Sequence, residues 1–158
     1  MRAIFKNGKF ISGHHFTPSK TSIPVVANLL VELIEREAGD DVEKVILLER
    51  YVAYAKVHNS ASEQILMLIG ALLLAFAKAG YKVLATRAID WKTKLCKHLF
   101  VEKGFKNPGK DFGKVYSMAA AKELTGREFK NDHIADAVCL GYSATLPGLK
   151  CQVLYSPY

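Results

Sequence analysis

The chain has 158 residues, of which 50% are apolar and 23% are charged. This length suits one domain, residues 1–158, and the composition excludes a disordered or collagen-like chain. The start, MRAIFKNGKF, lacks the apolar block of a secretory signal. The longest apolar run, residues 65–77, is shorter than the roughly 18 residues that span a membrane, so we expect a buried core helix and no membrane partner.

The net charge of +7 is concentrated in one part of the chain. Residues 78–130 contain 13 Lys and Arg against 5 Asp and Glu, a balance of +8, and the remainder balances at −1. Such a concentration is typical of a surface that binds DNA or RNA. An ordinary solvated face is the alternative, and charge alone does not choose between them.

The three cysteines are Cys96, Cys139 and Cys151. Their odd number and the lack of a CxxC spacing argue against a disulfide framework and against a zinc knuckle. A reducing cytoplasm is therefore the expected compartment.

The first half of the chain predicts a hairpin followed by alternating helices and strands. Two short strands surround Asn7-Gly8, a dipeptide favoured in tight turns. A helical stripe over residues 21–37 stops at Gly39. The run KVILLERY, residues 44–51, predicts a strand that is covered on both faces. A helix over 60–79 ends at Gly80, and residues 81–87 form the next strand.

The second half predicts mainly helices. We expect a basic helix around 90–99, a loop rich in Gly and Lys at 103–113, a helix at about 113–125, and a last helix that contains NDHIADAVCLGY, residues 131–142. The order of elements predicts an α/β fold in which a mixed sheet is covered by helices.

Glu49 is the first candidate for chemistry. It lies near the C-terminal end of a predicted core strand, where ligands gather in open α/β sheets. A carboxylate there is costly to bury unless it is paired or bound to a cation. The alternative is an ion pair with Arg50 or with a nearby lysine.

His133 and Asp136 are the second candidates. Positions i and i+3 lie on one face of a helix and can reach a common point. Asn131 or Asp132 could cap this helix, and capping is the interpretation that we favour for Asp132. Asp136 lies one turn further in, where capping explains it less well. Together with Glu49, the pair offers the oxygen and imidazole ligands that suit a divalent metal.

These motifs, in this order, resemble the RuvC-type Holliday-junction resolvases, which have the RNase H-like nuclease fold. The similar part runs from residue 3 to about 145 and includes the strand that ends in Glu49 and the stretch HIADAVCLGY. The resemblance implies an RNase H-like mixed sheet flanked by helices. It also implies that Glu49, His133 and Asp136 are catalytic metal ligands for Mg²⁺ or Mn²⁺, two ions per site.

The resemblance further implies how DNA is contacted. Basic residues of the family contact DNA near the cleavage site, and the matching positions are Lys92, Lys94, Lys110 and Lys114. Tyr51 and Tyr54 follow the strand Glu and could stack on exposed bases. Surface lysines and packing aromatics are the alternatives. The family acts as homodimers on branched DNA, in the cytoplasm of bacteria or of phage-infected cells.

One family feature is missing from the sequence. RuvC-type enzymes begin with a central strand that ends in a metal-binding Asp, but this chain has no Asp before Asp40. Its first residues instead match the hairpin that follows that strand. We therefore hypothesise that the N-terminal central strand is missing because the chain is shortened, and that a longer product carries about 10–15 further residues.

The leading hypothesis is a metal-dependent endonuclease that resolves four-way DNA junctions. A second hypothesis, favoured by the missing Asp, is a DNA-binding module of the same fold without catalysis. A third is a nuclease that acts on RNA–DNA hybrids, because charge does not distinguish RNA from DNA.

Overall fold

The structure is a computed structural model that describes residues 2–6, 9–14, 22–38, 44–50, 60–104 and 114–157. Two compact units make up the chain, each built from two segments. Unit 1 comprises Met1–Thr17 and Ala88–Lys150, and unit 2 comprises Pro18–Arg87 and Cys151–Tyr158. That residues 1–158 act as one domain stays a prediction.

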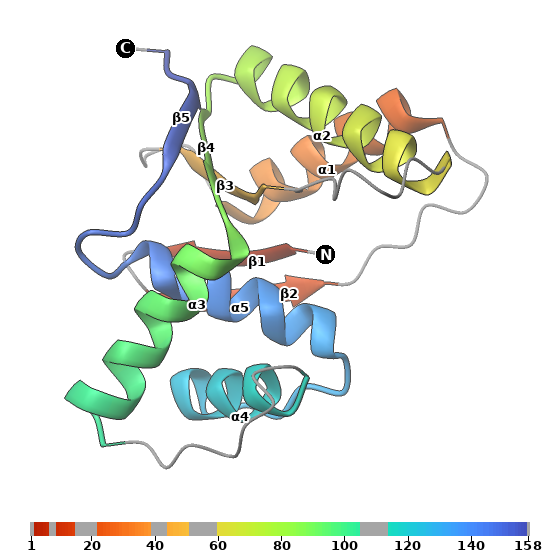
Figure 1. Ribbon diagram of the computed structural model, residues 1–158. Coiled ribbons are helices and arrows are strands. Elements are labelled where there is room, and N and C mark those ends of the chain that lie inside the picture. Colours follow the sequence, from red (N-terminus) through yellow and green to blue (C-terminus); the bar gives the residue numbers. More distant parts are fainter. Residues whose placement is uncertain are drawn as a thin grey trace. The chain divides into compact units, whose positions relative to one another are not determined.

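Unit 2 contains a mixed three-stranded sheet in the order β3-β4-β5 (Figure 1). Strand β3 (Val45–Glu49) runs parallel to β4 (Lys82–Thr86), and β4 pairs antiparallel with β5 (Gln152–Tyr155). Unit 2 also contains the helices α1 (Ile23–Ala38) and α2 (Ser60–Lys78), which pack on each other. Helix α2 contacts the strands β4 and β5. The predicted α/β fold with a mixed sheet and flanking helices is confirmed.

The core of unit 2 contains one cluster of buried residues, Val31, Phe76, Tyr81 and Val83. Val26, Ala27 and Ala85 of the same unit are buried as well. The rings of Phe76 and Tyr81 meet edge to face, with their centroids 5.3 Å apart. The core therefore joins α1, the end of α2 and the start of β4.

Strand β3 is less covered than its sequence predicts. Among the described strands it lies at an edge of the sheet, and its middle residues are half-buried while Val45 is 43% exposed. The prediction that both faces are covered is wrong. An apolar run predicts burial but does not say whether a strand is central or at an edge.

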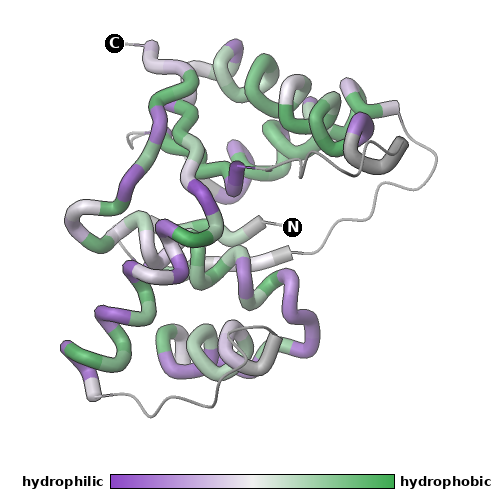
Figure 2. The backbone as a smooth tube through the Cα atoms, in the orientation of Figure 1, coloured by the Kyte–Doolittle hydropathy of each residue, from purple (hydrophilic) through white to green (hydrophobic). Residues whose placement is uncertain are grey.

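Helix α2 is also less buried than predicted. Its apolar sequence is continuous in Figure 2, yet four large side chains stay exposed: Ile65, Leu66, Met67 and Leu74. The prediction of a buried core helix is therefore wrong for one face of α2. A helix buries only the face that meets α1 and the sheet, whatever the composition of its other face.

Strand β5 was not predicted from the sequence. It is only four residues long, and its pairing partner β4 lies more than 60 residues earlier in the chain. A run as short as QVLY has no local signal that distinguishes a strand from an extended tail.

Unit 1 places a hairpin against a group of helices. Strand β1 (Arg2–Lys6) pairs antiparallel with β2 (Lys9–His14), and Lys6 faces Lys9 across the hairpin. The predicted hairpin is confirmed, although Asn7 and Gly8 themselves lie outside the described residues. Both strands contact helix α5 (Asp132–Ala144). Helix α4 (Lys114–Thr125) packs on the same helix.

Helix α3 (Ala88–Cys96) continues as a π-helix, η1 (Lys97–Glu102). This helical segment is longer at both ends than the predicted helix at 90–99. A π-helix closes i→i+5 hydrogen bonds and is rare, so periodicity analysis does not anticipate it.

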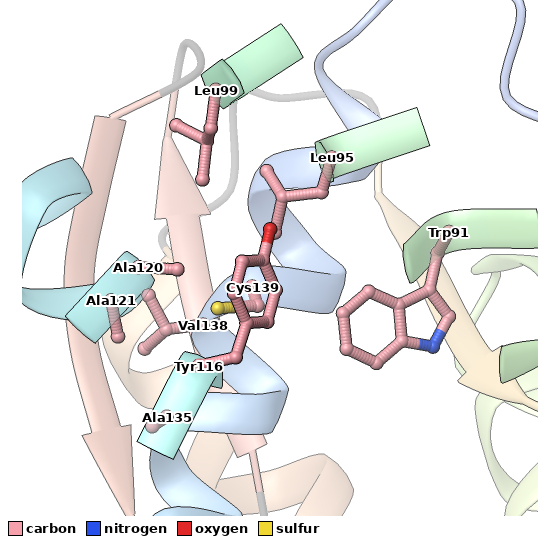
Figure 3. Packing of buried hydrophobic residues seen from close by; sticks show 9 residues of the cluster. All are labelled: Trp91, Leu95, Leu99, Tyr116, Ala120, Ala121, Ala135, Val138 and Cys139. Atoms are coloured by element: carbon pink, nitrogen blue, oxygen red, sulfur yellow. The ribbon is translucent and has the colours of Figure 1, made fainter. Parts of the chain in front are cut away.

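The core of unit 1 joins these helices. Figure 3 shows side chains of α3, η1, α4 and α5 converging, all of them 0–1% exposed. Several of the α4 and α5 members are small, including Ala120, Ala121 and Ala135, which lets the helices approach closely. The cluster as a whole comprises Trp91, Leu95, Leu99, Tyr116, Ala120, Ala121, Ala135, Val138 and Cys139.

The described strands form two sheets, β1-β2 and β3-β4-β5. The hypothesis of a missing central strand stays a prediction. Within the part of the chain that the structure describes, no helix is both long and apolar enough to cross a lipid bilayer.

Candidate functional site

Helix α5 begins with a side-chain cap. The Oδ1 atom of Asn131 accepts hydrogen bonds from the backbone N–H groups of His133, at 2.9 Å, and Ile134, at 3.4 Å. Asn131 has the extended backbone of an N-cap residue, with φ −122° and ψ 119°. The favoured capping role of Asp132 is therefore wrong, because Asp132 is already the first residue of the helix.

The cap fixes the start of α5, which carries His133 in its first turn and Asp136 one residue beyond that turn. The two residues are three positions apart and lie on one face of the helix. His133 is exposed, whereas Asp136 is half-buried. The structure thus places this predicted pair on one surface at the start of α5.

A hydrogen bond from the neighbouring helix orients Asp136. The hydroxyl group of Ser117, on α4, donates to Oδ1 of Asp136. Ser117 is itself 2% exposed, so its position is fixed by packing. A carboxylate with one oxygen held this way can still offer its other oxygen to a cation, the usual arrangement of an oriented metal ligand.

The charge of Asp136 also affects the core behind it. Burial, and then the negative charges of Asp136 and Cys96, raise the pKa of the Cys139 thiol to about 12. The charge of Lys92 acts in the opposite direction on the same thiol.

Glu49 lies in unit 2, at the end of β3. It is exposed and in register with Thr86 of β4, and the N–H group of Arg50 donates to the Thr86 carbonyl oxygen at 2.7 Å. Within either unit, the described residues contain no group of three or more His, Cys, Asp or Glu side chains placed to bind one metal ion. Of the three predicted ligands, His133 and Asp136 thus lie in unit 1 and Glu49 lies in unit 2.

The predicted DNA-binding residues fall into two groups. Lys92 stacks over the ring of Trp91, with Nζ 5.2 Å from the centroid, and Nζ of Lys94 lies beside Gly148, in the turn that follows α5. Lys114 begins α4, but its side chain lies outside the described part of the structure. Lys110, Tyr51 and Tyr54 also lie outside the described residues.

Ser117 is the residue that sequence reasoning missed. It lies in KVYSMAAAK, where a serine among small residues gives no functional signal. Only the packing of α4 against α5 brings its hydroxyl group to Asp136.

No family model and no curated protein matches the sequence. Solved structures do match. Thermus thermophilus RuvC in complex with a Holliday-junction substrate is 15% identical, with a TM-score of 0.64, and the match covers 91% of this chain and 85% of that chain. A second structure of Thermus thermophilus RuvC is 16% identical, with a TM-score of 0.58, over 87% of this chain and 76% of that one.

These matches show the fold. The chain has a RuvC-like α/β fold, in agreement with the mixed sheet and its flanking helices. Identities of 15–16% do not by themselves show which activity the fold performs.

Proposed function

We propose that this protein is a metal-dependent endonuclease that cleaves four-way (Holliday) DNA junctions. The observation that carries the proposal is the His133–Asp136 face of α5 in a chain whose fold matches, over 91% of its length, a RuvC bound to such a junction. The excess of 13 basic over 5 acidic residues between positions 78 and 130 supports a nucleic-acid substrate.

Asp136, His133 and Glu49 are the proposed metal ligands, and Mg²⁺ or Mn²⁺ is the proposed ion, two per site. The donor set fits, because carboxylate oxygens and imidazole suit these divalent cations, and Ser117 orients Asp136. When bound, the ions would activate a water molecule and stabilise the leaving 3′ oxygen.

The protein's own groups have distinct roles in this proposal. Asp136 and Glu49 supply negative charge that attracts the cations. His133, which is exposed at the start of α5, can also transfer a proton at the substrate. Lys92 and Lys94 attract the phosphate backbone, as do Lys110 and Lys114, while Tyr51 and Tyr54 stack on bases.

A homodimer is part of the proposal, because a four-way junction has two strands to cut and a two-fold dimer provides two sites. The exposed face of α2 supports it. Leu66, Met67 and Leu74 are 51%, 63% and 58% exposed, and Gly70 lies between them with no heavy atom within 4 Å of an added Cβ. Positions 66, 70 and 74 share one helix face, so a second copy can pack closely there.

Substitution of Asp136 by Asn tests the catalytic proposal. The amide oxygen still accepts the Ser117 hydrogen bond, so the helix pair is kept while the negative charge is lost. We expect cleavage of a four-way junction in Mg²⁺ to fall by about 100-fold or more, since a metal centre contributes several kcal/mol to the barrier. Junction binding, measured in Ca²⁺ by gel shift, should stay within about twofold.

The matched control is Asp132→Asn, which removes the same charge one turn earlier on α5. It should retain cleavage. Equal cleavage by the wild type and Asp136→Asn would refute the role of Asp136. A wild type that binds junctions without cutting them would favour the second hypothesis, the DNA-binding module. Faster cleavage of an RNA–DNA hybrid than of a junction would favour the third hypothesis.

A further inference from the structure

A pocket of about 250 Å³ opens on unit 1, away from the face that carries Asp136. It lies between the hairpin, the end of α4 and the second half of α5. Tyr142, which lines the pocket, follows Asp136 by six residues on α5. At about 100° per residue, the Tyr142 side chain leaves the helix about 240° around its axis from Asp136. The pocket is therefore separate from the proposed metal ligands of α5.

Aromatic rings form much of its wall. Phe5 and Phe10 are cross-strand partners in the hairpin, with ring centroids 5.7 Å apart. Phe129 packs on Phe10 from behind, at 5.8 Å. These edge-to-face contacts leave ring surface in the pocket for a planar ligand.

Tyr142 is held in place from the other side. Its hydroxyl group lies 3.5 Å from Nε2 of His98, and Nδ1 of the same ring lies 2.5 Å from Glu102. The Nζ atom of Lys103 lies 5.8 Å from the centroid of the Tyr142 ring. The wall is thus fixed by contacts outside the pocket, and a ligand does not have to order it.

The polar part of the lining is cationic. Lys9 and Arg127 are exposed at the pocket, and the Arg127 guanidinium lies 5.5 Å from the centre of the Phe10 ring. The Thr125 hydroxyl group donates a hydrogen bond to the Ala121 carbonyl oxygen at 2.7 Å and accepts one from the backbone N–H group of Arg127. Its hydrogen bonds are therefore made within the protein. None of the described residues that line the pocket is a carboxylate.

A ligand for this pocket should combine a flat ring with a negative charge. A cavity of about 150 Å³ takes one benzene ring, so a pocket of about 250 Å³ has room for one nucleobase. We propose that the pocket binds one unpaired nucleotide of a DNA strand, with its base against Phe10 and Tyr142 and its phosphate at Lys9 and Arg127. This inference rests on the proposed DNA substrate and adds a second contact to it.

The test measures the binding of a fluorescent single-stranded oligo(dT) by anisotropy, with a fully paired duplex for comparison. The double substitution Lys9→Gln and Arg127→Gln should weaken single-strand binding about tenfold, and it should lower the salt dependence by about one to two ions. Phe10→Leu, which keeps an apolar side chain in the hairpin, should weaken it about tenfold through lost stacking. Lys97→Gln, which removes an exposed positive charge elsewhere in unit 1, is the control and should bind as the wild type does.

The duplex separates a nucleotide pocket from a general basic surface. A paired base cannot enter the pocket, so the double variant should lose much less affinity for duplex than for single strand. Equal losses on both, or unchanged single-strand binding, would overturn the proposal. Thermal unfolding by circular dichroism checks that Phe10→Leu remains folded, and the exposed Lys9 and Arg127 variants give an answer even if it does not.

The outcomes also separate this inference from the proposed function. If the wild type cleaves junctions and the double variant binds oligo(dT) as tightly as the wild type does, the pocket proposal would be refuted and the endonuclease proposal would stand. If the wild type cuts no junction but the double variant binds oligo(dT) more weakly, the pocket proposal would stand and the endonuclease proposal would be refuted. Free thymidine monophosphate, used as competitor, should displace oligo(dT) far less effectively than unlabelled oligo(dT), since it lacks the neighbouring phosphates.

Discussion

Unit 1 and unit 2 bury their apolar side chains to different extents. Nine residues of unit 1 form one buried cluster with 0–1% exposure, whereas the buried cluster of unit 2 has four residues, which are 0–8% exposed. Unit 2 also carries most of the large exposed apolar side chains of the described residues: Val25, Leu29, Val45, Ile65, Leu66, Met67, Leu74, Val153 and Tyr155. Unit 1 thus has a self-contained core, and unit 2 has apolar surface available for association.

The difference bears on the proposed metal ligand of α5 and on the proposed dimer face in different ways. In unit 1, Asp136 is oriented by the buried Ser117 on a pair of closely packed helices, α4 and α5. The exposed helix face of unit 2 is suited to contact with a second copy. Substitutions that disturb association should therefore cluster in unit 2, and those that disturb local geometry should cluster in unit 1.

The largest effect is expected at Met67. Met67→Glu places a charge on the proposed dimer face of α2, and burying an unpaired charge is costly. We expect dimer dissociation to increase by at least about 100-fold, as measured by analytical ultracentrifugation. Asn28→Glu adds the same charge at an exposed position of α1 and is the control. A Met67→Glu protein that stays dimeric would show that this face does not mediate association, and a monomeric wild type would refute the dimer.

Two helical glycines give a matched pair across the units. A methyl group added at Gly141, on α5, would overlap the ring of Phe5, whereas one added at Gly70, on α2, meets no atom within 4 Å. Gly141→Ala should lower the free energy of unfolding by about 1–3 kcal/mol through overpacking. Gly70→Ala should raise it by up to about 1 kcal/mol, because Ala favours a helix. Urea unfolding measures both, and a neutral Gly141→Ala would contradict the close packing of β1 on α5.

The buried thiol of unit 1 gives the smallest of these effects and a defined pH window. The pKa of Cys139 is raised from 9.0 to about 12, chiefly by burial. Because the unfolded thiol ionises first, its contribution to stability is complete below pH 9 and is lost as the pH rises towards 12. At pH 10 this loss is on the order of 1 kcal/mol.

The measurement is urea unfolding at pH 8 and pH 10, with Cys139→Ala as the reference. The wild type should lose more stability than the variant between these pH values, by about 1 kcal/mol. The two proteins would lose the same stability if the thiol were accessible to solvent.

The exposed Cys151, which lies in unit 2, should react with iodoacetamide in the native protein, while Cys139 should not.

Local patterns in the sequence predicted much of the fold. Asn7-Gly8 predicted the hairpin β1-β2, and the apolar periodicity predicted α1 and α5. The i and i+3 spacing placed His133 and Asp136 on one face. These features depend on residues that are close in sequence, so a single sequence is enough to find them.

Features that depend on distant pairing were not predictable. Strand β3 was expected to be covered on both faces, but its residues are only half-buried or exposed. Among the described strands it pairs with β4 alone, and no local pattern in its sequence indicates which strands pair with it. Strand β5 pairs with β4 across more than 60 residues. The contact between Ser117 and Asp136 requires α4 to pack on α5, and no local pattern specifies that packing.

The proposal that Glu49 and Asp136 are ligands of one metal centre has a direct test. Manganese binding, followed by the relaxation of water protons, tests it directly with Glu49→Gln, Asp136→Asn and the double variant. If the ligands share an ion, each single substitution should weaken Mn²⁺ binding at least about tenfold. The loss in the double variant should then be smaller than the product of the two single losses, because both side chains act on the same ion. Unchanged binding by Glu49→Gln, or losses that add fully in the double variant, would contradict the claim.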